Sequence, residues 1–177
     1  MIRIIYILQK INNGVAVIAG LALLACITII IFDIVLREVG ISFSGSEEIS
    51  GYVMAAVTSW GVSYGLTAKA HVRIDFLREK SNALGRSLFD LISLAALSYV
   101  AVYVAYHAIS VLNKTLKTGA LSNTAMEVPL YIPQTIWLAG WVWFAISSSL
   151  LLIIAIILLI QGEHTQINNT IGIGEDL

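Results

Sequence analysis

The chain has 177 residues, of which 58% are hydrophobic and 12% are charged, and its net charge is −1. Soluble domains carry about 25% charged residues, and the mean hydropathy of +0.88 indicates an integral membrane protein. A nearly neutral chain has no basic surface for nucleic acid. A single cysteine, Cys26, provides neither a disulfide nor a thiolate metal cluster, and the pattern predicts no cofactor.

The first membrane span is expected over residues 14–36, an apolar run that is too long for the hydrophobic part of a signal peptide. Residues 1–13 have helical spacing, which fits either a short interfacial helix or the first turns of this span. Near the end of the span, Asp33 and Arg37 are four residues apart and can pair on one face. Such a pair either anchors the helix at the level of the lipid headgroups or contacts another subunit.

The second span is expected over residues 49–68, just after Glu47 and Glu48. Ser44 and Glu47 match a capping box, and the helix dipole favours acidic residues in a first turn. One of the two carboxylates can also face Arg37 across the short loop. We therefore expect Arg37, Glu47 and Glu48 to form a charged cluster that fixes the first helix against the second and positions a partner.

The second helix also carries a surface of small residues. Small residues let helix backbones approach closely in lipid, where close packing drives association, so this helix is expected to be the central packing element. One stripe of small residues recurs every four positions, and a GxxxG pair lies on a neighbouring face. The stripe consists of Gly51, Ala55, Ser59 and Ser63, and the pair of Gly61 and Gly65.

The third and fourth spans are expected over residues 87–112 and 134–160, followed by a polar tail over residues 161–177. Residues 69–86 hold five basic residues, which fits either an amphipathic segment on the membrane surface or an ordinary basic loop. His107 lies inside the third span. A hydrogen-bonding role in packing is favoured over a proton relay for it, because no carboxylate of that helix lies at its depth.

The charges of the loops predict the orientation. Four spans place both termini on one side of the membrane, and the segments on that side hold seven of the ten Lys and Arg residues. The positive-inside rule therefore places both termini in the cytoplasm and Glu47 and Glu48 on the other side. The sequence predicts an all-α integral membrane protein with four transmembrane helices in a single domain, residues 1–160, and with short amphipathic segments at the membrane surface.

Several motifs follow one another along the chain in a specific order. They are Arg37 at the end of the first helix, the pair Glu47 and Glu48, the small-residue helix, the stretch His71-Val72-Arg73-Ile74-Asp75, and the connector over residues 126–133. This order resembles the small membrane subunit of tripartite ATP-independent periplasmic (TRAP) transporters, the DctQ-like family, over about residues 15–160. The chain departs from that family's pattern at Ala70, where a glycine is usual, and at Ser46, where a tryptophan is usual.

The resemblance implies a system of three proteins at a bacterial inner membrane. A soluble periplasmic protein captures the substrate, usually an organic acid, and a large membrane subunit carries it across together with sodium. The small subunit is implied to be a scaffold for the large one, without enzymatic activity or a sodium site of its own, and with phospholipid on its helix surfaces. The residues expected at a subunit interface or in a structural charge cluster are Arg37, Glu47, Glu48, His71, Arg73 and Asp75.

Two other classes of function stay open from the sequence. A stand-alone transporter or channel needs an ionisable group in the middle of the membrane, for which His107 is the candidate. A membrane-anchor subunit that binds haem needs two axial ligands at matching depth. The three histidines do not fit that requirement, because His71 is expected in a loop, His107 in a span and His164 in the tail.

Overall fold

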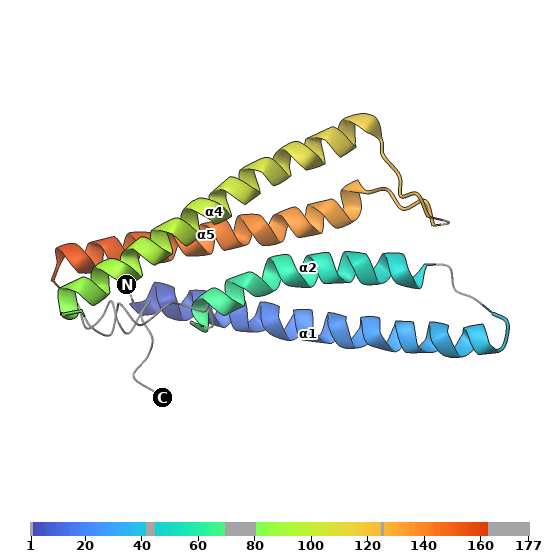
Figure 1. Ribbon diagram of the computed structural model, residues 1–177, viewed down its shortest axis with the longest axis horizontal. Coiled ribbons are helices and arrows are strands. Elements are labelled where there is room, and N and C mark those ends of the chain that lie inside the picture. The colour runs from blue at the N-terminus through green and yellow to red at the C-terminus, as the bar shows by residue number, and fades with distance from the viewer. Residues whose placement is uncertain (1, 42–44, 70–80, 125, 163–177) are drawn as a thin grey trace.

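The protein is described by a computed structural model over residues 2–41, 45–69, 81–124 and 126–162. This described part contains four helices and one isolated antiparallel bridge, between Leu121 and Pro129. The fold is therefore all-helical, as the sequence predicts. The helices are α1 (Ile2–Glu38), α2 (Ser46–Thr67), α4 (Ala83–Thr118) and α5 (Tyr131–Ile160) (Figure 1).

In the described part of the chain, three helices are long and apolar enough to cross a membrane, over Arg3–Glu38, Leu84–Thr118 and Tyr131–Ile160. The helix α2 is less apolar, because glycine, serine and threonine occupy much of its surface. Its 22 residues extend over about 33 Å at about 1.5 Å of rise per residue. The hydrocarbon core of a bilayer is about 30 Å thick, so α2 is long enough to span it.

All four helices begin before the predicted spans, and α1 and α4 extend furthest beyond them. The helix α1 begins at Ile2, so the N-terminal segment forms its first turns rather than a separate interfacial helix. The helix α4 begins after Asn82, whose side chain accepts a hydrogen bond from the Gly85 N–H at 2.9 Å and satisfies one free donor of the first turn. It ends before Gly119, which has φ +60°, a conformation that glycine adopts readily.

The helices lie side by side in the order α1, α2, α5, α4, so α2 and α5 are central and α1 and α4 are outer (Figure 1). The end of α1, the start of α2 and the connector between α4 and α5 lie at one end of the molecule. The starts of α1 and α4 and the ends of α2 and α5 lie at the opposite end. The helices α4 and α5 separate towards the connector.

The buried core lies where α4 packs on α5 and where the start of α1 and the end of α2 join them. The most apolar part of α1 is only 6% buried, against 39% for α5, so lipid or a partner must cover most of α1. The buried apolar side chains of this core are Leu8, Leu66, Leu94, Ala101, Ala105, Phe144, Ala145, Leu151, Ile154, Ala155 and Leu158.

Candidate functional site

The small-residue stripe of α2 meets α5 of the same chain. Ser59 and Ser63 are fully buried. A Cβ atom on Gly140 of α5 would lie 2.9 Å from the Cβ atom of Ser59, a distance that real side chains do not adopt, so only glycine fits there. Beside this contact, the indole N–H of Trp60 donates a hydrogen bond to the Ile136 carbonyl at 3.0 Å. The two central helices are thus joined by close packing and by a side-chain hydrogen bond.

Elsewhere on α2, the described residues leave open space beside Gly51 and Gly61. Ala55 is half-buried and Gly51 is exposed. A side chain added at Gly51 or at Gly61 would meet no atom of the described residues within 4 Å, and Gly65 is half-buried. Close approach between helices is therefore seen at Ser59, in the middle of the stripe, and not at Gly61 of the GxxxG pair.

Asn12 of α1 forms a buried polar junction among three helices. Its Nδ2 donates hydrogen bonds to the Ser63 carbonyl at 2.9 Å and to the Thr67 hydroxyl at 3.2 Å, both on α2. Its Oδ1 accepts a hydrogen bond from Nε1 of Trp143, on α5, at 2.8 Å. Both ends of this fully buried amide are thereby hydrogen-bonded, which offsets the cost of burying it in apolar surroundings.

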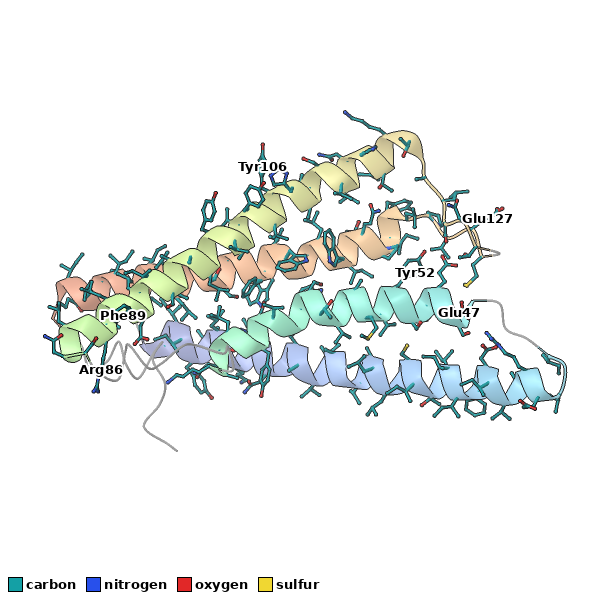
Figure 2. All side chains as sticks on the ribbon, in the orientation of Figure 1. Glu47, Tyr52, Arg86, Phe89, Tyr106 and Glu127 are labelled. Carbon is teal, nitrogen blue, oxygen red and sulfur yellow. The ribbon has the colours of Figure 1, made fainter. Side chains whose placement is uncertain are left out.

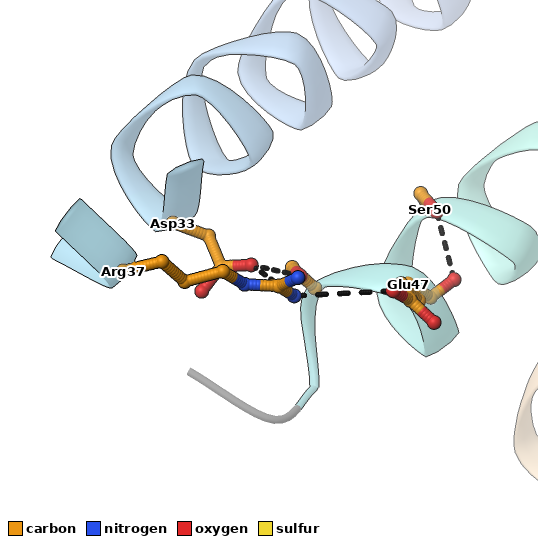
Figure 3. Close-up of polar contacts among 5 residues, drawn as sticks. Asp33, Arg37, Glu47 and Ser50 are labelled. Atoms are coloured by element: carbon orange, nitrogen blue, oxygen red, sulfur yellow. Dashed lines mark hydrogen bonds and ion pairs between the residues drawn. The ribbon is translucent and has the colours of Figure 1, made fainter. Parts of the chain in front are cut away.

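At the opposite end of the α1–α2 pair, Asp33 is the centre of a charged edge (Figure 3). The buried Asp33 carboxylate accepts a hydrogen bond from the Ser46 hydroxyl at 2.6 Å, and its Oδ2 lies 2.7 Å from Nη2 of Arg37. The same Arg37 nitrogen is 3.9 Å from Oε1 of Glu47, whose side chain is 88% exposed. The guanidinium of Arg37 therefore pairs mainly with Asp33 and only weakly with Glu47.

Glu48 contacts the connector instead of Arg37. The hydroxyl of Tyr52 donates to one oxygen of its carboxylate, and the hydroxyl of Thr124 in the connector donates to the other. Hydrogen bonds from Thr124, then from Tyr52 and Ser122, hold the pKa of Glu48 below its ordinary value, because they favour the charged form more than burial disfavours it. The structure thus brings Arg37 near Glu47 and gives Glu48 a separate role.

The start of α2 differs from the expected capping box. The residue before the helix is Gly45, which has no side chain to cap it, and Ser44 of the predicted capping box lies outside the described residues. A Cβ atom on Gly45 would lie 3.1 Å from Cγ of Met126 in the connector and closer still to its sulfur atom. The connector therefore lies directly against the start of α2 at Gly45.

The predicted interface residues His71, Arg73 and Asp75 lie outside the described residues. His107 is exposed on α4, with its ring centroid 4.4 Å from that of Tyr103. It therefore lies on an outward surface of the helix layer rather than along a path between the helices.

Sequence reasoning did not find three residues of this site: Asn12, Thr124 and Gly140. Their partners lie far away along the chain, as in the pair Asn12 and Trp143, which is 131 residues apart. A single polar residue or glycine produces no periodic pattern. One signal that the sequence offers is the polar side chain of Asn12, because a polar side chain in an apolar helix generally needs a hydrogen-bonding partner.

Comparison with known proteins gives one family match. The family model described as "Tripartite ATP-independent periplasmic transporters, DctQ component" matches residues 26–162. The match includes the charged edge, the small-residue stripe, α4 and α5. No curated protein and no solved structure shows a significant match to the chain.

Proposed function

Because the chain belongs to the DctQ family of tripartite ATP-independent periplasmic transporter components, we propose that it is the small membrane subunit of such a transporter. In this role it is a rigid support for a larger membrane subunit, which carries the substrate. The observation that carries the proposal is the way in which α2 is held by both of its neighbours.

The helix α2 is bonded to α1 near both of its ends. Asn12 and Asp33, the two residues of α1 that make these contacts, are roughly 31 Å apart at about 1.5 Å of rise per residue. Between the two contacts, Ser59 packs against Gly140 of α5. A subunit whose own helices rearrange during transport must break such contacts in each cycle, whereas a support keeps them.

The described helices also lack the interruptions at which transport sites are usually formed. Substrate and ion sites in secondary transporters are commonly formed by interrupted helices near the middle of the bilayer. In the described part of this chain, all four helices are continuous. This supports a role in which the large subunit, and not this chain, holds the substrate and the coupling ion.

The proposed placement in a bacterial inner membrane has four spans, including α2, with both termini in the cytoplasm. The length of α2 supports this, since about 33 Å matches a hydrocarbon core of about 30 Å. The distribution of Lys and Arg supports the orientation. Glu47, Glu48 and the connector then face the periplasm, where a soluble binding protein delivers the substrate.

The energy source and the substrate class belong to the same proposal. The family description names an ATP-independent system, so the uphill step needs an ion gradient, for which sodium is proposed. An organic acid is the proposed substrate. Both rest on the resemblance of the motifs to those of the family.

Reconstitution into proteoliposomes tests this function. The large subunit and this chain are reconstituted together and separately, with the binding protein and a sodium gradient outside. We expect uptake of the organic acid only when both membrane proteins are present. Uptake by this chain alone would show instead a stand-alone transporter, and full uptake by the large subunit alone would remove the need for a support.

Cysteine labelling tests the placement. In a Cys26→Ala background, a cysteine at Lys80 should react with an impermeant reagent only from the cytoplasm, and a cysteine at Asn123 only from the periplasm. Labelling of both positions from the same side would mean that α4, which lies between them in the chain, does not cross the membrane. The reverse pattern would invert the orientation.

A further inference from the structure

The outer helix α4 carries a polar aromatic surface on the side that faces away from α5. We call this surface the tyrosine–histidine face, and it consists of Tyr99, Tyr103, Tyr106 and His107. The three tyrosines are 71%, 54% and 68% exposed, and Figure 2 shows the labelled Tyr106 pointing away from α5. The positions follow the helical repeat, so all four side chains project from one side of α4.

The members of this face contact one another. The rings of Tyr99 and Tyr103 are stacked with their centroids 6.2 Å apart, and the ring of His107 lies 4.4 Å from Tyr103 and 5.4 Å from Tyr106. Among the residues that the structure describes, no group forms a hydrogen bond with the three tyrosine hydroxyls. The face is therefore a continuous strip of rings with free hydrogen-bonding groups at its surface.

The tyrosine–histidine face lies at a depth where lipid tails cannot form hydrogen bonds with its polar groups. Asp90 and Lys114 of α4 are about 36 Å apart along the helix, which matches a hydrocarbon core of about 30 Å between them. Tyr99 is about 13 Å from Asp90 and about 22 Å from Lys114 along the axis, so it does not belong to an aromatic belt at the membrane surface. Hydrocarbon tails provide no hydrogen-bonding partner for hydroxyl and imidazole groups at this depth.

The other outer helix, α1, has a surface of the kind that lipid can cover. Over the same depth, α1 exposes apolar side chains such as Val17, Leu21 and Leu24. Its exposed Thr28 hydroxyl donates to the Leu24 carbonyl of its own helix at 2.8 Å, so it needs no partner. A tyrosine hydroxyl lies at the end of a rigid ring and cannot bond to its own helix in this way.

A groove adjoins the face where α4 and α5 separate. It has a volume of ≈ 480 Å³, and its lining includes Val102, Tyr106, Ile109 and Ile146. Side chains of a partner helix fit into such a groove, whereas its backbone and polar groups can reach the hydroxyls beside it.

We propose that the tyrosine–histidine face is the docking surface for the large membrane subunit, and that its hydroxyl and imidazole groups form hydrogen bonds with polar groups on a transmembrane helix of that subunit. This rests on the proposed function, which requires a protein partner within the membrane. The outer face of α1 then contacts lipid.

Site-specific photocrosslinking in the assembled complex tests the proposal. The chain is expressed together with the large subunit, with p-benzoylphenylalanine placed either at Tyr103 or, as the matched control, at Leu24 on the outer face of α1. We expect a crosslink to the large subunit from position 103 and none from position 24. A crosslink from position 103 only to a second copy of this chain, or no protein crosslink from that position, overturns the proposal.

Removal of the hydroxyls tests the hydrogen bonds themselves. The triple variant Tyr99→Phe/Tyr103→Phe/Tyr106→Phe keeps the rings, and we expect it to retain about twentyfold less of the large subunit in an affinity purification, the loss expected for three hydrogen bonds between transmembrane helices. The control Thr28→Val removes a hydroxyl from α1 and should retain the wild-type amount. Equal retention by the triple variant overturns the proposal.

The order of the measurements separates this inference from the proposed function. Co-purification of the two wild-type proteins is measured before any variant. If they do not co-purify, the proposed function fails. If they do co-purify but crosslink only through α1, the proposed function stands and the assignment of the α4 face is overturned.

Discussion

Two polar contacts hold α1 against α2, and they differ in almost every respect. The junction at Asn12 is neutral, fully buried and shared with α5, and each of its polar atoms has a hydrogen-bonding partner. The charged edge at Asp33 contains ions, and it is partly open to solvent through the half-exposed Arg37 and the exposed Glu47. The first contact therefore depends on tertiary packing, whereas the second depends on neighbours in sequence.

This difference indicates which of the two contacts contributes more to the stability of the helix arrangement. Exposed ion pairs contribute little, about 0–1 kcal/mol, because water and salt screen them. A buried polar group that loses its partner costs about 1–3 kcal/mol, since it can no longer be solvated by water. We therefore expect the junction to stabilise the arrangement of helices more than the charged edge does, although the edge holds more charge.

The largest effect is expected from Asn12→Leu, which keeps the side-chain volume but removes the amide. Loss of the acceptor for Trp143 and of the donor to Ser63 should lower the free energy of unfolding by roughly 2–4 kcal/mol. The measurement is reversible unfolding in detergent. The matched control is Asn13→Leu at the exposed neighbouring position, which should be nearly neutral. Equal effects of the two substitutions would show that the junction contributes nothing specific.

A smaller effect is expected from Arg37→Met at the charged edge. This change leaves the buried Asp33 carboxylate with the Ser46 hydrogen bond but without its cation. The expected loss is about 1–3 kcal/mol, between the values for exposed and buried pairs, because Arg37 is half-exposed. The additional change Asp33→Asn should recover part of the loss by removing the unpaired charge. If Asp33→Asn makes no difference to the Arg37→Met protein, the two residues do not interact.

The third effect concerns pH and Glu48. Its pKa is held below its ordinary value of 4.5 by hydrogen bonds from Thr124, Tyr52 and Ser122. A lowered folded-state pKa contributes stability that is present above 4.5 and is lost as the pH falls through the lowered value. In Glu48→Gln, the part of the acid destabilisation below pH 4.5 that is due to this carboxylate should disappear. The measurement is the melting temperature of both proteins between pH 7 and pH 3, and parallel curves would contradict the prediction.

A related charge swap sharpens the distinction between the two glutamates. The variant Glu48→Arg should not be rescued by Arg37→Glu, because the contacts of Glu48 are to Tyr52 and Thr124. The measurement compares the amount of large subunit that assembles with Glu48→Arg and with the double variant Glu48→Arg/Arg37→Glu. Recovery of assembly in the double variant would indicate a direct pair between Arg37 and Glu48, in conflict with the structure.

The smallest effect is expected from Glu47→Gln. Glu47 is largely exposed, and its oxygen is at the outer limit of an ion pair with Arg37. Its removal should leave the melting temperature unchanged at 0.15 M salt, where exposed charges are screened. A clear loss of stability that persists at high salt would show that the charged edge is stronger than its exposure suggests.

Features that depend on neighbouring residues could be predicted from the sequence alone. Long apolar runs predict helices in a membrane, and the spacing of Asp33 and Arg37 predicts the ion pair that the structure shows at 2.7 Å. The short loop between α1 and α2 also makes these two helices adjacent, so Glu47 lies near Arg37. All of these follow from local geometry, which helical periodicity fixes without knowledge of the rest of the fold.

The contacts between residues that are distant in the chain could be read only from the three-dimensional fold. The order α1, α2, α5, α4 places Ser59 against Gly140, Asn12 beside Trp143, and Glu48 beside Thr124. In a bilayer, several pairings of apolar helices bury similar surfaces, because lipid tails are as apolar as the helices themselves. The choice among them therefore depends on a few close contacts and buried hydrogen bonds, whose partners are too far apart in the chain for its pattern to reveal.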